Sequence, residues 1–218
     1  MTGARHVRPL LLAATVIACI VPGTIRAQAP PTAEGWDSGR WRFGPLAVTP
    51  ALALKNLGWD GNVFNDAVDP KSDLTATAAV PIEWWLRVGR ARVHGVDEFE
   101  GVWFATYDDQ RSFNQRHDLT LVVPLNRIRP YVGATYVNVS DRPGYEINAR
   151  VHHTDAGANG GLVVRLTSRI DLDLRGRQTA YRYDDVPSAG LYLSETLDRR
   201  TGNYGARLEY RYTSETSF

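Results

Sequence analysis

Cysteine is nearly absent from this chain, since Cys19 is the only one among its 218 residues. Without a second cysteine the sequence predicts neither a disulfide nor a thiolate metal site. An excess of one charge is also lacking: 25 Lys and Arg residues stand against 24 Asp and Glu residues. No basic excess therefore argues for a nucleic-acid partner. Beyond residue 30, no apolar run is long enough for a helix that crosses a membrane.

The N-terminus has the features of a secretory signal peptide. Basic residues precede an apolar core at residues 10–21, and this core is too short to span a membrane as a helix. Small residues follow, and we expect cleavage after Ala27. An alternative is a lipobox at residues 16–19, which would make Cys19 a lipidated N-terminus.

The signal peptide predicts export and divides the chain into three parts. We expect the signal peptide at residues 1–27, a periplasmic lead-in at residues 28–39 and one domain at residues 40–218.

Residues 73–107 carry the clearest structural pattern. From Leu74 to Val88, apolar residues at even positions alternate with mostly polar residues at odd positions, and a similar run follows the short link at residues 88–91. Successive side chains of a strand point to opposite faces, so each run has one apolar face and one largely polar face. A soluble strand has about five or six residues, whereas a membrane-crossing strand needs roughly 9–11. The stretch therefore predicts a transmembrane β-hairpin.

The rest of the domain repeats this pattern and predicts about eight strands in all. We expect them at residues 40–55, 74–88, 92–107, 116–124, 130–140, 150–166, 170–183 and 204–213. Pro50 indicates a bulge or a barrel seam, and the glycines at residues 156–161 weaken the strand that contains them. The link at residues 184–202 is expected to hold a short helical turn at residues 192–197.

The links between these strands alternate in length. Short links are expected near residues 88–91, 125–129 and 167–169, and longer ones near residues 56–72, 107–113, 140–149 and 184–202. Bacterial barrels have short periplasmic turns and long outer loops. Aromatic residues also gather near both ends of the strands, where the lipid headgroups lie. The predicted fold is all-β, an antiparallel up-and-down transmembrane β-barrel in the bacterial outer membrane.

Several short motifs support this prediction by resemblance. They are GPL at residues 44–46, LGWDGNVF at 57–64, PLNRIRPY at 124–131 and DRPGYEI at 141–147. Together they resemble outer-membrane proteins of the β-barrel porin 2 type, over most of the domain. The resemblance implies a β-barrel with passive solute passage or a surface role, and no catalytic residues. Its partners would be outer-membrane lipid, lipopolysaccharide and the barrel-insertion machinery.

Barrels of that family are usually longer than this chain. Two options therefore stay open: a closed small barrel, or the N-terminal part of a larger one. The C-terminal Phe218 fits the aromatic end of an outer-membrane barrel, but the last alternating strand ends earlier, at Tyr212 or Thr213.

Charged residues gather on the polar faces of the expected strands, which would line the lumen. The candidates are Glu83, Arg87, His94, Glu98, Glu100, Asp118, Arg175, Arg177, Arg207 and Glu209. They either select solutes in a pore or pair with one another as a plug, because eight strands leave room only for side chains. The predicted function is porin-like passage of small solutes, with a plugged structural or adhesive barrel as the alternative.

Other residue groups predict neither an enzyme nor a cofactor. His152 and His153 are neighbours in a strand and point to opposite faces, so they cannot easily share a metal ion. His94, Glu98 and Glu100 share one face, but no Ser or Cys nucleophile is marked near them. The chief rival fold is a soluble lipocalin-like barrel, which would turn the apolar faces inward.

Overall fold

The computed structural model describes residues 39–66, 68–142, 150–185, 187–188 and 191–211. The signal peptide expected at residues 1–27, nearly all of the expected lead-in, the alternative lipidation site at Cys19 and the C-terminal residues 212–218 lie outside these ranges. None of the helical segments within them has the length and hydropathy that a membrane crossing requires.

One antiparallel sheet of ten strands makes up most of the described chain. Its members are β1 (Trp41–Phe43), β2 (Leu46–Pro50), β3 (Ala53–Asp60), β4 (Asp73–Val88), β5 (Ala91–Phe104), β6 (Ser112–Val122), β7 (Ile128–Asp141), β8 (Val151–Arg165), β9 (Ile170–Tyr183) and β12 (Arg199–Tyr210). Neighbours in the sheet follow the order β1-β2-β4-β5-β6-β7-β8-β9-β12, and β3 also pairs with β4. The all-β antiparallel prediction is confirmed at this level.

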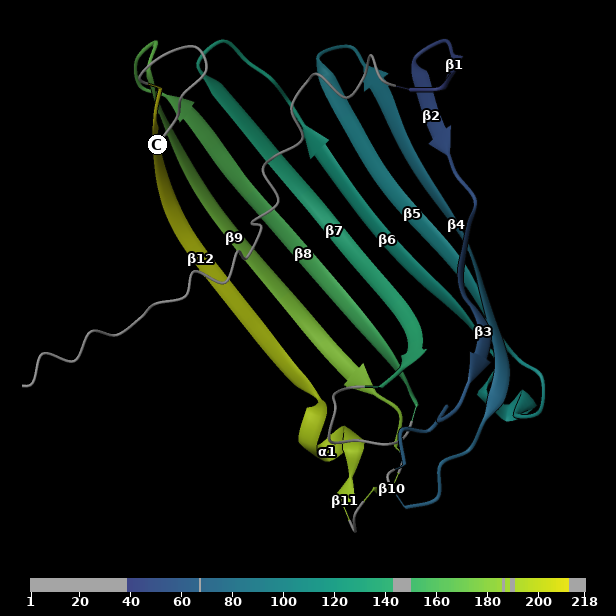
Figure 1. Ribbon diagram of the computed structural model, residues 1–218. Coiled ribbons are helices and arrows are strands. Elements are labelled where there is room, and N and C mark those ends of the chain that lie inside the picture. Colours follow the sequence, from purple (N-terminus) through teal and green to yellow (C-terminus); the bar gives the residue numbers. More distant parts are fainter. Residues whose placement is uncertain (1–38, 67, 143–149, 186, 189–190, 212–218) are drawn as a thin grey trace, which may run out of the picture.

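The sheet is curved into a trough of tilted strands (Figure 1). The short links between strands gather at one end of the trough. The opposite end carries the longer connections, which include a 3-10 turn at Asp108–Gln110, the small β10 (Pro187–Ser188) and β11 (Leu191–Tyr192) pair, and helix α1 (Leu193–Leu197). The predicted helical turn at residues 192–197 is therefore confirmed. Within the described residues, β12 does not pair with β1, β2 or β3, so hydrogen bonds do not close the sheet.

The expected single strand at residues 40–55 is wrong. The chain reverses at Gly44, whose φ of 58° is one that glycine adopts at no steric cost, and β1 folds back on β2. Opposite β4, β2 and the first residues of β3 follow one register, with an interruption after Pro50. Within β3 the register then shifts by one residue between Lys55 and Gly58. There the N–H of Ala51 donates to the carbonyl of Pro81 (2.9 Å), and neither proline has an N–H to continue the ladder.

The glycine-rich part of β8 is a regular strand, contrary to the weakness expected from its composition. The strand pairs with β7 and β9 along almost its whole length. A Cβ atom at Gly161 would lie 2.5 Å from Tyr131 Cζ, and one at Gly157 would lie 2.4 Å from Thr135 Oγ1. These glycines are required because side chains of β7 lie across them.

The two faces of the sheet differ sharply in polarity. Residues directly opposite in antiparallel strands share a face, so the register assigns every strand position. The concave face holds the buried side chains, among them Trp85, Asn114, Val139 and Thr179. The convex face holds large apolar side chains that are exposed. They include Leu54, Val80, Trp103, Phe113, Leu119, Val132, Leu174, Tyr204, Leu208 and Tyr210.

Candidate functional site

The register puts all the sequence-predicted lumen candidates on the concave face. On the first strands, Glu83 lies opposite Val96, and His94 lies opposite Trp85 and Thr120. The rows continue across the sheet to Arg175, Arg177, Arg207 and Glu209 on β9 and β12. These charges therefore share one face of the sheet, and whether that face lines a lumen stays a prediction.

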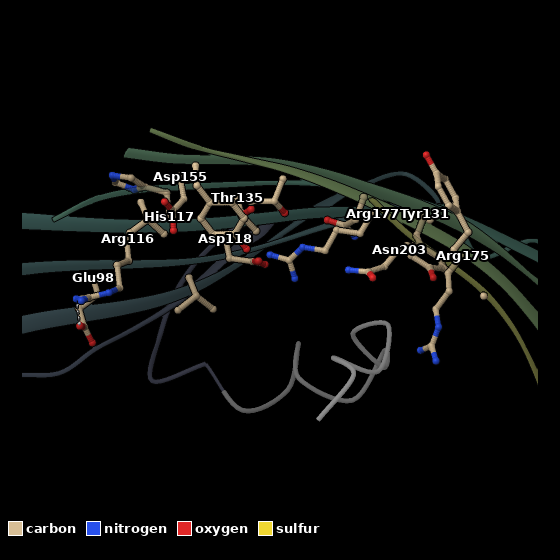
Figure 2. A pocket seen from close by; sticks show the side chains of 18 residues that line it. Glu98, Arg116, His117, Asp118, Tyr131, Thr135, Asp155, Arg175, Arg177 and Asn203 are labelled. Atoms are coloured by element: carbon tan, nitrogen blue, oxygen red, sulfur yellow. Dashed lines mark hydrogen bonds and ion pairs between the residues drawn. The ribbon is translucent and has the colours of Figure 1, made fainter. Parts of the chain in front are cut away.

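A cavity of about 900 Å³ lies along the concave face, between β5 and β12. Four of the candidates line it: Glu98, Asp118, Arg175 and Arg177. The view into the cavity shows Glu98, Arg116 and Asp118 toward one side and Arg175 and Arg177 toward the other (Figure 2). Glu100 lines a smaller cavity of about 320 Å³ nearer the long loops. The remaining candidates, Glu83, Arg87, His94, Arg207 and Glu209, line neither.

An ion-pair network forms one side of the cavity. Glu98 Oε1 lies 3.3 Å from Arg116 Nη1 and 3.5 Å from Lys55 Nζ. Lys55 also lies 3.2 Å from Glu100 Oε2, and Asn114 Nδ2 donates to Glu100 Oε1 (3.0 Å). Lys55 comes from β3, so this network links the edge of the sheet to its centre.

The acid–base group considered from the sequence is not assembled. His94 Nε2 lies 2.9 Å from Glu83 Oε1, and its ring stacks on Trp85 with 3.9 Å between centroids. No hydrogen bond joins His94 to Glu98 or Glu100 among the contacts of the described residues. The enzymatic hypothesis thus gains no support from the geometry of these side chains.

The neighbouring histidines face opposite sides of β8, as the sequence predicts. His153 is buried on the concave side, between Asp155 (3.0 Å from Nδ1) and Asp141 (3.2 Å from Nε2). His152 lies on the convex side against Asn138 and Asp184. Within the described ranges, no group of three or more His, Cys, Asp or Glu residues could hold a metal ion.

Basic residues of β9 form the other side of the cavity. Arg175 Nη1 lies 4.0 Å from Asp173 Oδ2, and Tyr131 donates its hydroxyl to Asp173 Oδ1 (3.3 Å). Four further residues line the cavity but were not among the lumen candidates predicted from the sequence. They are Tyr131, Asp155, Asn159 and Asn203. On β7, β8 and β12, the residues of the concave face have odd numbers. These four residues also have odd numbers, so the alternation along each strand could have identified them.

A polar group interrupts the apolar convex face. Asp97 Oδ1 lies 2.6 Å from His117 Nδ1, and Asp97 Oδ2 accepts a hydrogen bond from Trp84 Nε1 (2.6 Å). The His117 ring meets Phe99 edge-on at 5.4 Å between centroids. Every polar atom of the Asp97 carboxylate thus has a partner.

Backbone and side-chain contacts order the long-loop end. Asp73 accepts hydrogen bonds from the backbone N–H groups of Leu74, Thr106 and Tyr107. In the loop before β4, the backbone N–H groups of Val68 and Asp69 hold the pKa of the Asp66 carboxyl below its usual value.

No protein-family model, no curated protein and no solved structure matches this chain. The resemblance to the β-barrel porin 2 type, which depends on the short motifs given above, stays a prediction. The functional argument therefore depends on the geometry of the sheet.

Proposed function

We propose that the chain is a bacterial outer-membrane β-barrel protein that lets small solutes pass through a charged interior. The observation that carries this proposal is the reversed polarity of the sheet, with exposed apolar side chains outside and paired charges inside. On the convex face, Phe113 is 60% exposed, Val132 is 54% exposed and Leu208 is 61% exposed. Soluble monomers rarely expose a continuous apolar surface of this kind.

Placing these side chains in hydrocarbon removes the free-energy cost of exposing them to water. A fully buried Val, Leu or Phe side chain is stabilised by about 1.5–3 kcal/mol relative to water. The convex face carries exposed large apolar side chains on β4, β5, β6, β7, β9 and β12, so their sum is large compared with the stability of a typical domain. Lipid around the sheet would remove the apolar convex face from water without a protein partner.

Strand lengths support the same proposal. The strands β4 to β9 and β12 have between 11 and 16 residues. A tilted strand needs roughly 9–11 residues to cross the hydrocarbon. Each of them is therefore long enough to cross.

The two edges of the sheet require a partner in a bilayer, because unpaired backbone groups cost several kcal/mol in hydrocarbon. The alternating directions of the strands make β12 antiparallel to β3. Pairing of β12 with the β1–β3 edge would close a small barrel. Pairing of both edges with additional strands would make a larger one.

The cavity favours passage over a plugged interior. Its volume of about 900 Å³ is large enough for a small solute. The second candidate, a plugged structural barrel, is favoured by the network around Lys55, Glu98 and Arg116, in which paired charges fill part of the interior. The two functions differ in whether a solute crosses.

Reconstitution into lipid vesicles tests both candidates. The protein is refolded in detergent, its folded state is checked by heat-modifiable gel mobility, and the uptake of the neutral sugar arabinose is measured by vesicle swelling. Swelling above that of empty vesicles supports passage. A folded, inserted protein without swelling supports the plugged barrel. A protein that stays monomeric in water without detergent contradicts both.

Disulfide cross-linking tests which strands pair with the two edges of the sheet. One cysteine replaces Leu54 on β3, and a second replaces Gly202, Tyr204 or Ala206 on β12, one at a time. A closed barrel in vesicles yields a cross-link at one of these positions. If none forms in the inserted protein, the edges pair with other strands.

A further inference from the structure

The two ends of the trough carry opposite charge. The short-link end, where the short links gather (Figure 1), consists of residues 40–47, 86–92, 123–129, 165–170 and 207–211. These residues include eleven arginines and a single acidic residue, Glu209. The described residues of the long-loop end fall within 60–73, 104–112, 140–151 and 183–199, and they include eleven acidic and five basic residues. The short-link end is therefore strongly basic.

Each short link between the long strands carries one exposed arginine. Arg90 lies between β4 and β5, Arg127 between β6 and β7, and Arg169 between β8 and β9. The links contain no Asp or Glu, and none of the three arginines forms an ion pair with another described residue. Their guanidinium groups are therefore available to a partner outside the chain.

Exposed apolar side chains stand close to these arginines in the chain. They are Val88, Ile128 and Leu166, and the exposed aromatic rings of Trp41 and Tyr210 lie at the same end. An arginine beside apolar residues can lay its stem along hydrocarbon while its charged head stays among the lipid headgroups. Aromatic rings are also enriched at this level of a membrane. The short-link end thus combines the residues that a membrane boundary favours.

We infer that the short-link end binds the phosphate groups of anionic phospholipids through Arg90, Arg127 and Arg169. A guanidinium is suited to this role because it can hold a phosphate through two parallel hydrogen bonds. In the proposed orientation, with the short links in the periplasm, these lipids belong to the periplasmic leaflet. The inference deepens the proposed membrane location and rests on it.

The distribution of the arginines favours lipid over an acidic protein segment. The three links recur every two strands, which corresponds to about 10 Å at the usual strand spacing. A protein segment would need a basic patch in one place, whereas a lipid leaflet presents phosphate groups all along this end. Every short link between the long strands can therefore make the same contact.

Lipid selectivity is measured with the unaltered protein inserted in phosphatidylcholine vesicles. Electron spin resonance compares spin-labelled phosphatidylglycerol with spin-labelled phosphatidylcholine at the protein surface. We expect the anionic lipid to associate about fivefold more strongly, the factor that one basic residue contributes near an anionic surface. High salt should reduce this preference, because exposed charges are screened. Equal association of the two lipids would overturn the inference without any variant.

Arginine variants assign the preference to the links. The test variant combines Arg90→Gln, Arg127→Gln and Arg169→Gln. The matched control combines Arg92→Gln, Arg129→Gln and Arg165→Gln. The control removes the same charge from the same hairpins, but its residues lie on the concave face, opposite Arg87, Val163 and Asp171. The preference should disappear in the test variant and persist in the control. Equal behaviour of the two variants would contradict the assignment to the links.

Two further measurements separate the alternatives. Binding of polyglutamate to the inserted protein, without a preference for phosphatidylglycerol, would assign the basic end to an acidic protein partner and overturn the inference. Arabinose swelling without a lipid preference overturns the inference and leaves passage intact. A preference for phosphatidylglycerol in an inserted protein that shows no swelling supports the inference and argues against passage.

Discussion

The convex and concave faces of this sheet are built by the same strands, yet they handle polar groups in opposite ways. On the convex face, apolar side chains such as Val132 and Leu208 are exposed. On the concave face, polar side chains such as Asn114 and Thr179 are buried, and most charges are paired. A water-soluble sheet that covers a core has the reverse arrangement. The difference teaches that the surroundings of a sheet, rather than its strand pairing, determine which face must be apolar.

The convex face also has polar exceptions to this rule. Asp97 and His117 form an ion pair there. Their charges are neutralised within the protein. The predictions below test the contrast between the faces, beginning with the largest effect.

The largest effect is expected for a charge placed on the convex face. Val132→Lys should destabilise the protein in vesicles by about 3 kcal/mol, because it puts an ammonium group against hydrocarbon. Val137→Lys is the matched control, since Val137 lies on the same strand but faces the cavity, and it should cost less than about 1 kcal/mol. Urea unfolding in lipid vesicles measures both. Equal costs for the two variants would argue against lipid on the convex side.

Breaking the convex ion pair should have a smaller effect. His117→Ala leaves the Asp97 carboxylate without one of its two close partners and should cost about 2 kcal/mol. The double variant Asp97→Ala with His117→Ala should recover much of that loss, since it removes both polar groups. The same unfolding measurement compares them. A double variant less stable than His117→Ala would contradict the lipid contact.

Neighbouring glycines on β8 should respond differently to the same change. Gly161→Ala should cost about 1–3 kcal/mol, because the new Cβ meets Tyr131 and the carbonyl of Leu174, both at 2.5 Å. Gly160→Ala should be milder, since its nearest atom is 3.3 Å away. Thermal unfolding in detergent compares the two. Similar losses would show that the concave side chains do not lie across β8.

A charge change inside the cavity should alter selectivity more than stability. Glu98→Gln removes a carboxylate that pairs with Lys55 and Arg116, and such partly exposed pairs contribute about 0–1 kcal/mol. Arg116 loses its ion pair, while Lys55 keeps its pair with Glu100, so ion passage should shift toward anions. The reversal potential across a planar bilayer with a salt gradient measures the shift. An unchanged reversal potential in a conducting protein would exclude Glu98 from the path.

The smallest effect concerns a loop that belongs to neither face. Backbone N–H groups of Val68 and Asp69 lower the pKa of Asp66, so its carboxylate stabilises the loop above the pKa of the unfolded chain, about 4. That contribution is lost as the pH falls through the lower, folded pKa. The protection factor of the Val68 amide against hydrogen exchange, which corrects for the intrinsic pH dependence of exchange, should therefore decrease at acidic pH. Asp66→Asn should remove this pH dependence, and its persistence would implicate another group.

The sequence by itself determined the long strands and their two faces, but not the three short strands that begin within residues 40–55. Alternation from Leu74 to Val88 is a local property, and it assigned the lumen candidates to one face before any pairing was known. The long and short links and the helical turn at Leu193–Leu197 could also be predicted, because turn residues act over a few positions.

Only the tertiary structure decided which residues meet across the sheet. Register and curvature pair His94 with Glu83 and bring Asp118 and Arg177 into one cavity. They also place the Tyr131 side chain across Gly161. A glycine that was expected to weaken β8 is therefore required at this position. These contacts join residues far apart in the chain, and a local period of two carries no information about which strand becomes a neighbour or how strongly the sheet bends.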